Sequence, residues 1–168
     1  MRQRSKIGMI AGTGLFLAWP GAAATMRADL EDTNGNAVGS VMAETTESGH
    51  VLVSIDISGL PPGVRGVHFH ETGDCSATGF ESAGGHLAGD AEHGVRSGNG
   101  PHPGDLPNLH ITEDGTAQVE HFLTDLDSAD FVDADGAAVI VHGRADDYES
   151  QPAGDAGDRI ACGVFTEE

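Results

Sequence analysis

The sequence predicts an all-β domain in which about eight antiparallel strands form a sandwich or barrel. Three observations support this prediction: no strong helical periodicity is present, the apolar residues gather in short β-branched runs, and turn residues separate these runs. Few residues are aromatic (5%), whereas 25 of 168 are glycine, a composition that suits many turns. Many short strands joined in this way are typical of antiparallel sandwiches and barrels.

The predicted strands follow one another with a turn signal after each. The runs at 26–32 and 37–44 flank Asn34-Gly35-Asn36, a hairpin signal. Residues 50–57, "HVLVSIDI", alternate apolar and polar side chains before "SGLPPG" turns the chain. Further strands are predicted in the runs "VRGVHFH" (64–70), "AQVEHFL" (117–123), "AAVIVHG" (137–143) and "RIACGVF" (159–165).

Two long stretches between these strands are irregular. Residues 71–104 and 143–158 are rich in Gly, Asp and Pro and show neither a strand nor a helix pattern. A compact domain rarely keeps long structureless loops without a functional reason. We therefore expect both loops to be functional.

The first 24 residues have the pattern of a signal peptide. Arg2, Arg4 and Lys6 precede an apolar run at 7–19, and Ala22-Ala23-Ala24 matches a signal-peptidase site. The apolar run is shorter than the ~20 residues of a membrane-spanning helix, although a retained anchor is the alternative. We expect an exported protein with a single mature domain at 25–168.

The predicted mature domain is strongly acidic. It holds all 27 acidic residues but only five arginines and no lysine, a formal charge of −22. Such a surface repels polyanions, so nucleic acid and an anionic membrane are excluded as partners.

Both cysteines, Cys75 and Cys162, lie in this domain. An isolated pair in an oxidising compartment indicates one disulfide, and two buried free thiols are the alternative.

The histidines carry the strongest functional signal. His68 and His70 leave the same face of one strand, although such a pair alone is also compatible with a half-exposed polar face. Nitrogen and carboxylate ligands without thiolate suit Zn, Cu or Ni. A multi-histidine copper site and a His/Asp zinc site sharing one residue would use the candidates available. The other candidates are His86, His93, His102, Asp105 and His142, whereas His50, His110 and His121 are expected at ordinary surface or strand positions.

Five motifs in order over residues 66–165 resemble the bacterial exported copper/zinc superoxide dismutases. They are "GVHFHETGDC" (66–75), "GGH" followed by "HG" (84–94), "HPGDLPNL" (102–109), "VIVHGRADD" (139–147) and "GDRIACGVF" (157–165). The resemblance implies an eight-stranded Greek-key sandwich of the immunoglobulin-like type. It also implies a periplasmic or extracellular enzyme that converts superoxide to dioxygen and hydrogen peroxide. Copper would cycle between Cu(II) and Cu(I), and zinc would shape the site.

The resemblance also implies individual roles. Copper would be bound by His68, His70, His86 and His142, and zinc by His86, His93, His102 and Asp105. His86 would bridge the two ions and take part in catalysis. Asp146 would orient ligand histidines and Arg159 would guide superoxide, although a solvated acid and a paired surface arginine are the alternatives. Cys75 and Cys162 would pin the loop that follows the first two copper ligands.

Two departures from the family pattern affect this interpretation. His93 follows His86 by seven residues, one fewer than in the family, and "LAGDAE" replaces the usual Phe-Asn-Pro segment. The 143–158 loop is acidic where relatives carry positive side chains. Because one fold can host different functions, a non-catalytic copper- or zinc-binding module of the same fold, acting in metal storage or delivery, is the alternative function. The oligomeric state, monomer or homodimer, stays open.

Overall fold

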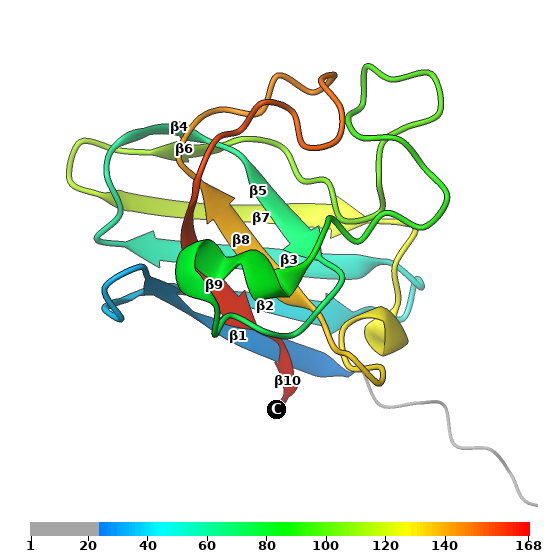
Figure 1. Cartoon of the computed structure of the whole chain (residues 1–168). Coiled ribbons are helices and arrows are strands. Elements are labelled where there is room, and N and C mark those ends of the chain that lie inside the picture. Colours follow the sequence, from blue (N-terminus) through cyan, green and yellow to red (C-terminus); the bar gives the residue numbers. More distant parts are fainter. Residues whose placement is uncertain (1–23) are drawn as a thin grey trace, which may run out of the picture.

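The computed structural model describes residues 24–168, which form an antiparallel sheet curled into a half-barrel (Figure 1). Of the predicted signal peptide, only Ala24 falls within the described residues. The sheet runs in the order β5-β8-β9-β1-β2-β3-β7, with β10 added beside β1. Its strands are β1 (Thr25–Asp32), β2 (Ala37–Thr45), β3 (Val51–Ser58), β5 (Val67–His70), β7 (Thr116–Leu123), β8 (Ala138–His142), β9 (Arg159–Val164) and β10 (Thr166–Glu167).

The sheet folds into two layers that enclose the core. In Figure 1, β5, β8 and β9 lie in front of β1, β2, β3 and β7. The later part of the 71–104 loop and the 143–158 loop lie above one end of the sheet. Neighbours that are distant in sequence, such as β9–β1 and β3–β7, give the Greek-key crossovers. The all-β sandwich prediction with two long loops is thus confirmed.

The predicted hairpin forms between β1 and β2. Asp32 accepts hydrogen bonds from the backbone amides of Asn34 (2.8 Å) and Asn36 (2.9 Å) through its carboxylate. Gly35 has a φ of 79°, a left-handed conformation that glycine adopts without strain. This turn chemistry was readable from the sequence because it is entirely local.

The predicted single strand at 64–70 is wrong in detail, because the chain bends at Gly66. β4 (Gly63–Arg65) pairs with β6 (Leu109–Ile111) in a separate two-stranded sheet, whereas β5 pairs with β8. The amide of Gly66 donates to the Arg144 carbonyl (2.8 Å), and its carbonyl accepts from the His142 amide (2.8 Å). These bonds to the end of β8 and the following loop separate the two strands. The short strands β6 and β10 were not predicted.

Alternation along β5 decides which side chains meet the core. Val67 and Phe69 face the interior, where Phe69, Phe131 and Phe165 pack edge-to-face with ring centroids 4.8–5.2 Å apart. His68 and His70 must therefore leave from the opposite face. The loops cover that face so completely that both histidines are at most 1% exposed.

A second, smaller apolar cluster supports the loop after β5. Phe80 and Ala83 of the 3₁₀ segment η1 (Thr78–Ala83) pack against Ala138, Ile140 and Cys162 of β8 and β9.

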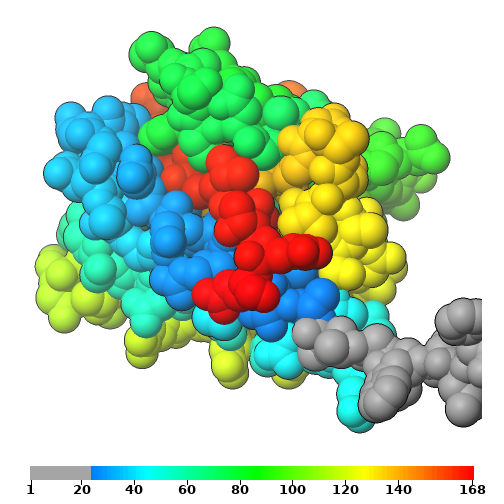
Figure 2. Space-filling model, turned by 90° about the horizontal axis from the view of Figure 1, so that it is seen from below, coloured from blue at the N-terminus to red at the C-terminus, as the bar shows by residue number. Residues whose placement is uncertain are grey.

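The segment η2 (Ser128–Asp130) precedes β8. Figure 2 shows the opposite end of the domain, where the C-terminal segment (red) lies along β1 (blue). Within the described residues, no helix has the length and apolar character needed to cross a membrane.

Candidate metal centre

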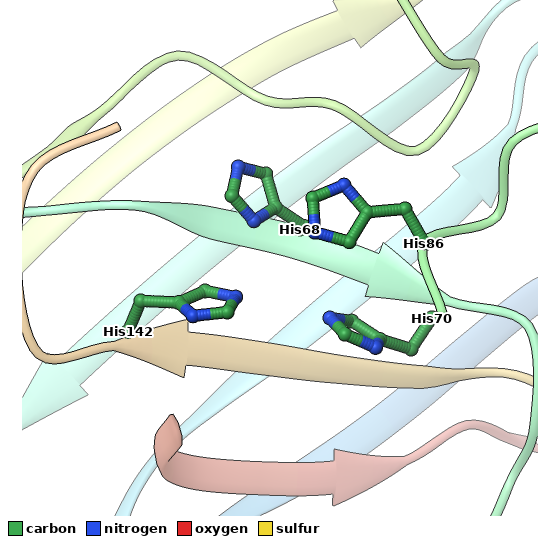
Figure 3. A group of neighbouring side chains, drawn as sticks. All are labelled: His68, His70, His86 and His142. Atoms are coloured by element: carbon green, nitrogen blue, oxygen red, sulfur yellow. The ribbon is translucent and has the colours of Figure 1, made fainter. Parts of the chain in front are cut away.

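Four buried imidazoles face one another beside β5 and β8. Figure 3 shows the rings of His68, His70, His86 and His142 turned toward a common space. Each contributes one nitrogen to a group whose members all lie within 4.8 Å of one another. The ring centroids of His68 and His86 are 4.1 Å apart, and those of His68 and His142 are 4.9 Å apart.

Each of these four rings has one anchored nitrogen and one without a hydrogen-bond partner. The Nδ1 atoms of His70 and His142 bond to the carbonyl oxygens of Gly84 (3.0 Å) and Gly157 (3.2 Å). A carbonyl can only accept, so both rings carry their proton on Nδ1 and present a lone pair at Nε2. Among the described residues, the buried nitrogens without a partner include His68 Nδ1, His70 Nε2, His86 Nε2 and His142 Nε2.

Burial favours the neutral form of three of these imidazoles, those of His68, His70 and His142. Desolvation lowers the pKa of His70 to about 2 and that of His142 to about 3. Desolvation also lowers the pKa of His68. Four converging lone pairs that are buried without a donor are costly unless a cation satisfies them, so the donor set fits a copper ion.

A second set of nitrogens converges on one carboxylate. Asp105 Oδ1 lies 3.0 Å from His86 Nδ1, 3.1 Å from His93 Nδ1 and 3.2 Å from His102 Nδ1. Its other oxygen, Oδ2, accepts from the amides of Gly94 (2.8 Å) and His102 (3.1 Å). Burial raises the pKa of Asp105, but hydrogen bonds led by His86 outweigh it, so the pKa is lowered and the group stays ionised. Three imidazole nitrogens around a carboxylate fit a tetrahedral zinc ion.

His102 completes this second set better than His68 does. Atoms of His68, His86, His93 and Asp105 also lie within 4.8 Å of one another. However, His68 Nε2 bonds to Asp146 (2.9 Å), and its Nδ1 belongs to the first group. His68 thus has no nitrogen left for a second ion. His102, in contrast, directs its Nδ1 at Asp105.

Backbone bonds dock the ligand loop onto the outer edge of β5. The amide of Phe69 donates to the Gly104 carbonyl (2.9 Å), and the amide of Leu87 donates to the Phe69 carbonyl (2.8 Å). These bonds place His86 opposite His70 and Asp105 opposite His68 in isolated β-bridges. His86 lies between the two groups, because its Nδ1 faces Asp105 and its Nε2 is without a hydrogen-bond partner beside the other three histidines.

Asp146 connects the two groups. Its Oδ2 accepts from His68 Nε2 (2.9 Å), and its Oδ1 accepts from His93 Nε2 (3.0 Å) and the Tyr148 amide (2.6 Å). Burial raises the pKa of Asp146, yet the bonds from His68 and His93 outweigh it and lower the pKa to about 2. A carboxylate in this position fixes which nitrogen of each ring is protonated.

Arg159 lies across the strand pair from His142. Its Nη1 donates to the Phe80 carbonyl (2.7 Å) and its Nη2 to the Gly84 carbonyl (2.7 Å). Burial lowers the pKa of Arg159, but a guanidinium stays cationic at neutral pH. The guanidinium is held by loop carbonyls and is not paired with an acid among the described residues.

The comparisons with known proteins agree with this geometry. The copper/zinc superoxide dismutase (SODC) profile matches residues 37–165. A superoxide dismutase [Cu-Zn] of Caulobacter vibrioides is 42% identical over 71% of this chain and 74% of its own length. A crystal structure of a SOD-like protein from Bacillus subtilis superposes with a TM-score of 0.78 at 35% identity, covering 83% of this chain and 97% of that one.

The chain belongs to the copper/zinc superoxide dismutase family. The family resemblance and the antiparallel fold expected from it are confirmed. The Brucella abortus copper/zinc superoxide dismutase has the same fold, with a TM-score of 0.70, 27% identity, and coverage of 84% of this chain and 99% of that one. Copper and zinc are the cofactors of this family, and the two histidine clusters offer the donors that both ions require.

The predicted disulfide of this superoxide dismutase family member is confirmed. Cys75 and Cys162 are bonded with their Cα atoms 6.0 Å apart, so the loop after β5 is fixed to β9. Of the three histidines expected outside the site, His50 and His110 are exposed, and His121 is partly buried in β7. None of the three belongs to either histidine group.

Sequence reasoning missed the residues that support the ligands. The side chain of Asn108 accepts from the Asp146 amide (2.8 Å) and donates to the Asp146 carbonyl (2.8 Å). The Tyr148 hydroxyl accepts from the Asn108 amide (2.7 Å). Gln151 bonds to the backbone of His93. Each contact spans about 40 to 60 positions, and no local pattern signals it.

Proposed function

We propose that this protein is a superoxide dismutase, which converts two superoxide ions and two protons to dioxygen and hydrogen peroxide. The supporting observation is the convergence of four buried imidazole nitrogens without hydrogen-bond partners, directly next to a His/Asp group that shares His86. In this proposal His68, His70, His86 and His142 bind copper, and His86, His93, His102 and Asp105 bind zinc.

Bound copper would supply the one-electron chemistry by alternating between Cu(II) and Cu(I), whereas zinc has no redox role. The chain's own contribution begins at His86, whose Nε2 would hold a proton between the two half-reactions and deliver it to the reduced substrate. The anchored Nδ1 atoms of His70 and His142 keep their rings in one orientation throughout. Arg159 would attract superoxide and orient it beside His142.

Metal analysis combined with a superoxide-decay assay tests this proposal. The purified protein is expected to bind one copper and one zinc per chain and to accelerate superoxide decay only when copper is present. A metal-replete protein that leaves superoxide untouched would instead support a non-catalytic copper/zinc-binding module. The relatives include a protein of Bacillus subtilis named superoxide dismutase-like protein YojM, 37% identical over 81% of this chain, which gives that second function its support.

The acidic loop predicts an unusual response of the rate to salt. Arg144 forms a surface ion pair with Asp155 (2.8 Å), so it contributes little positive charge to the approach of an anion. The net charge of the chain is −19, which repels superoxide at low ionic strength. Because salt screens exposed charges beyond ~10 Å at 0.1 M, the rate is expected to rise or to change little as KCl is added. A steep fall in the rate constant, measured by pulse radiolysis or stopped flow, would contradict this expectation.

We further propose that residues 1–24 are a signal peptide and that the domain at 25–168 acts in the periplasm or outside the cell. The basic start, apolar run and alanine triplet support this proposal. The intact mass of the exported protein tests it, because cleavage after Ala24 leaves Thr25 as the first residue. The assembly is proposed to be a monomer or a homodimer, to be distinguished by sedimentation.

A further inference from the structure

His93 is a zinc-ligand candidate in a stretch of chain that has little structure of its own. Residues 87–104 contain no helix or strand, and the subloop from His86 to His93 is short. His93 is nevertheless completely buried, and both its ring nitrogens contact carboxylates, Asp105 (3.1 Å) and Asp146 (3.0 Å). The backbone of His93 must therefore be fixed by something outside its own segment.

The Gln151 side chain fixes that backbone from the opposite loop. Its Oε1 accepts from the His93 amide (2.9 Å), and its Nε2 donates to the His93 carbonyl (2.8 Å). One carboxamide thus bonds to both backbone groups of the same residue, as a neighbouring β-strand would. The same Nε2 also lies 3.0 Å from Ser97 Oγ and 3.0 Å from the Glu149 carbonyl.

Two further contacts hold the loops together around this bond pair. Ser97 Oγ donates to the His93 carbonyl, and the Arg96 amide donates to the Tyr148 carbonyl (3.1 Å). Gly94 approaches the same segment so closely that a Cβ at this position would lie 2.1 Å from the Tyr148 carbonyl oxygen. The loop at 143–158 therefore fixes the position of the segment 93–97, which contains His93.

We propose that Gln151 is the positioning residue of the zinc half of the site. Its carboxamide fixes the His93 backbone so that Nδ1 reaches the zinc position while Nε2 meets Asp146. The proposal rests on the assignment of His93 as a zinc ligand. It adds that the geometry of this ligand is set by a side chain 58 residues away in sequence.

Gln151→Glu distinguishes a positioning role from a purely electrostatic one, because the two predict opposite changes in zinc affinity. The carboxylate has nearly the same size, but it has no N–H to donate to the His93 carbonyl. Its added negative charge alone would tighten the binding of a cation. If positioning dominates, zinc affinity falls instead, by about 10- to 100-fold, as is usual when a partner that orients a metal ligand is lost.

The experiment measures zinc dissociation by chelator competition on the copper-free, full domain. The visible absorption of the protein loaded with Co(II) at the zinc position is recorded in parallel. Gln118→Glu is the matched control, because it makes the same charge change on the exposed face of β7, where Gln118 bonds only to Asp56 (2.6 Å). We expect weaker zinc binding and an altered Co(II) spectrum for Gln151→Glu, and wild-type values for the control.

Ser97→Ala provides a second, milder test, because the Ser97 hydroxyl contacts both the His93 carbonyl and the Gln151 Nε2 that donates to the same carbonyl. Loss of one hydrogen bond to the His93 carbonyl is expected to weaken zinc binding about fivefold. This variant decides the matter if circular dichroism shows that Gln151→Glu does not fold. Unchanged zinc affinity and Co(II) spectra in a folded Gln151→Glu protein, or in Ser97→Ala when that protein must decide, would overturn the proposal. Failure of the wild-type protein to bind zinc would instead overturn the zinc-site assignment, and the positioning role with it.

Discussion

Replacing His86 with glutamine is expected to reduce superoxide dismutation by more than about 100-fold, which is the upper range seen when only a supporting partner of a metal ligand is lost. Nε2 of His86 belongs to the first histidine group, and Nδ1 lies 3.0 Å from Asp105 in the second. A single substitution therefore removes one proposed donor from each metal site and the proposed proton carrier as well. Glutamine is similar in size to histidine, but its single carboxamide does not offer two nitrogen donors that point in different directions.

The superoxide-decay rate and the copper and zinc content of His86→Gln check this expectation together. His110→Gln is the matched control, because His110 is exposed on β6 and belongs to neither metal-binding group. The control is expected to keep wild-type activity and metal content. Activity of His86→Gln within about tenfold of wild type, which corresponds to only ~1.4 kcal/mol in the barrier, would contradict the bridging role.

Removing the disulfide is expected to lower the free energy of unfolding by about 4–5 kcal/mol. The bond joins residues that are 87 positions apart, and the chain-entropy model gives this value for a loop of that length. Cys75→Ser combined with Cys162→Ser also releases the loop that carries Gly84, whose carbonyl anchors His70 and Arg159. Copper affinity is therefore expected to fall together with stability.

Urea unfolding of the metal-free double variant measures the change in stability. Wild-type protein under reducing conditions is the matched control, because it loses the same bond without a change of side chain. The two proteins are expected to agree within about 1 kcal/mol. A loss smaller than about 1 kcal/mol in both would show that the denatured chain gains little freedom when the bond is absent.

The sequence predicted the features that depend on local chemistry. Alternating side chains at 50–57 predicted β3, and Asn34-Gly35-Asn36 predicted the first hairpin. The spacing of His68 and His70 predicted that both leave one face of a strand, and the structure places them on the covered face of β5. The other ligand candidates followed from the remaining histidines and Asp105, and their division between copper and zinc came from the motif resemblance. The structure brings them together around His86 and Asp105.

The features that escaped prediction depend on contacts between distant segments. The break at Gly66 follows from hydrogen bonds to residues 142 and 144, and the run at 64–70 carries no sign of them. β6 and β10 are three and two residues long, too short for periodicity to show. Asn108 and Gln151 hold Asp146 and His93 through backbone groups, which leave no trace in residue type at the supported position.

The Gly84 carbonyl oxygen has a mechanical consequence for capture of the anion. It accepts from the Nδ1 of one proposed copper ligand, His70, and from the Nη2 of the proposed substrate guide, Arg159. Thermal displacement of this single oxygen carries ligand and guide in the same direction. When the loop moves, the distance between the His70 ring and the Arg159 guanidinium therefore changes less than it would if each were bonded to a different carbonyl. The orientation of the guanidinium relative to the His70 ring is preserved in the same way.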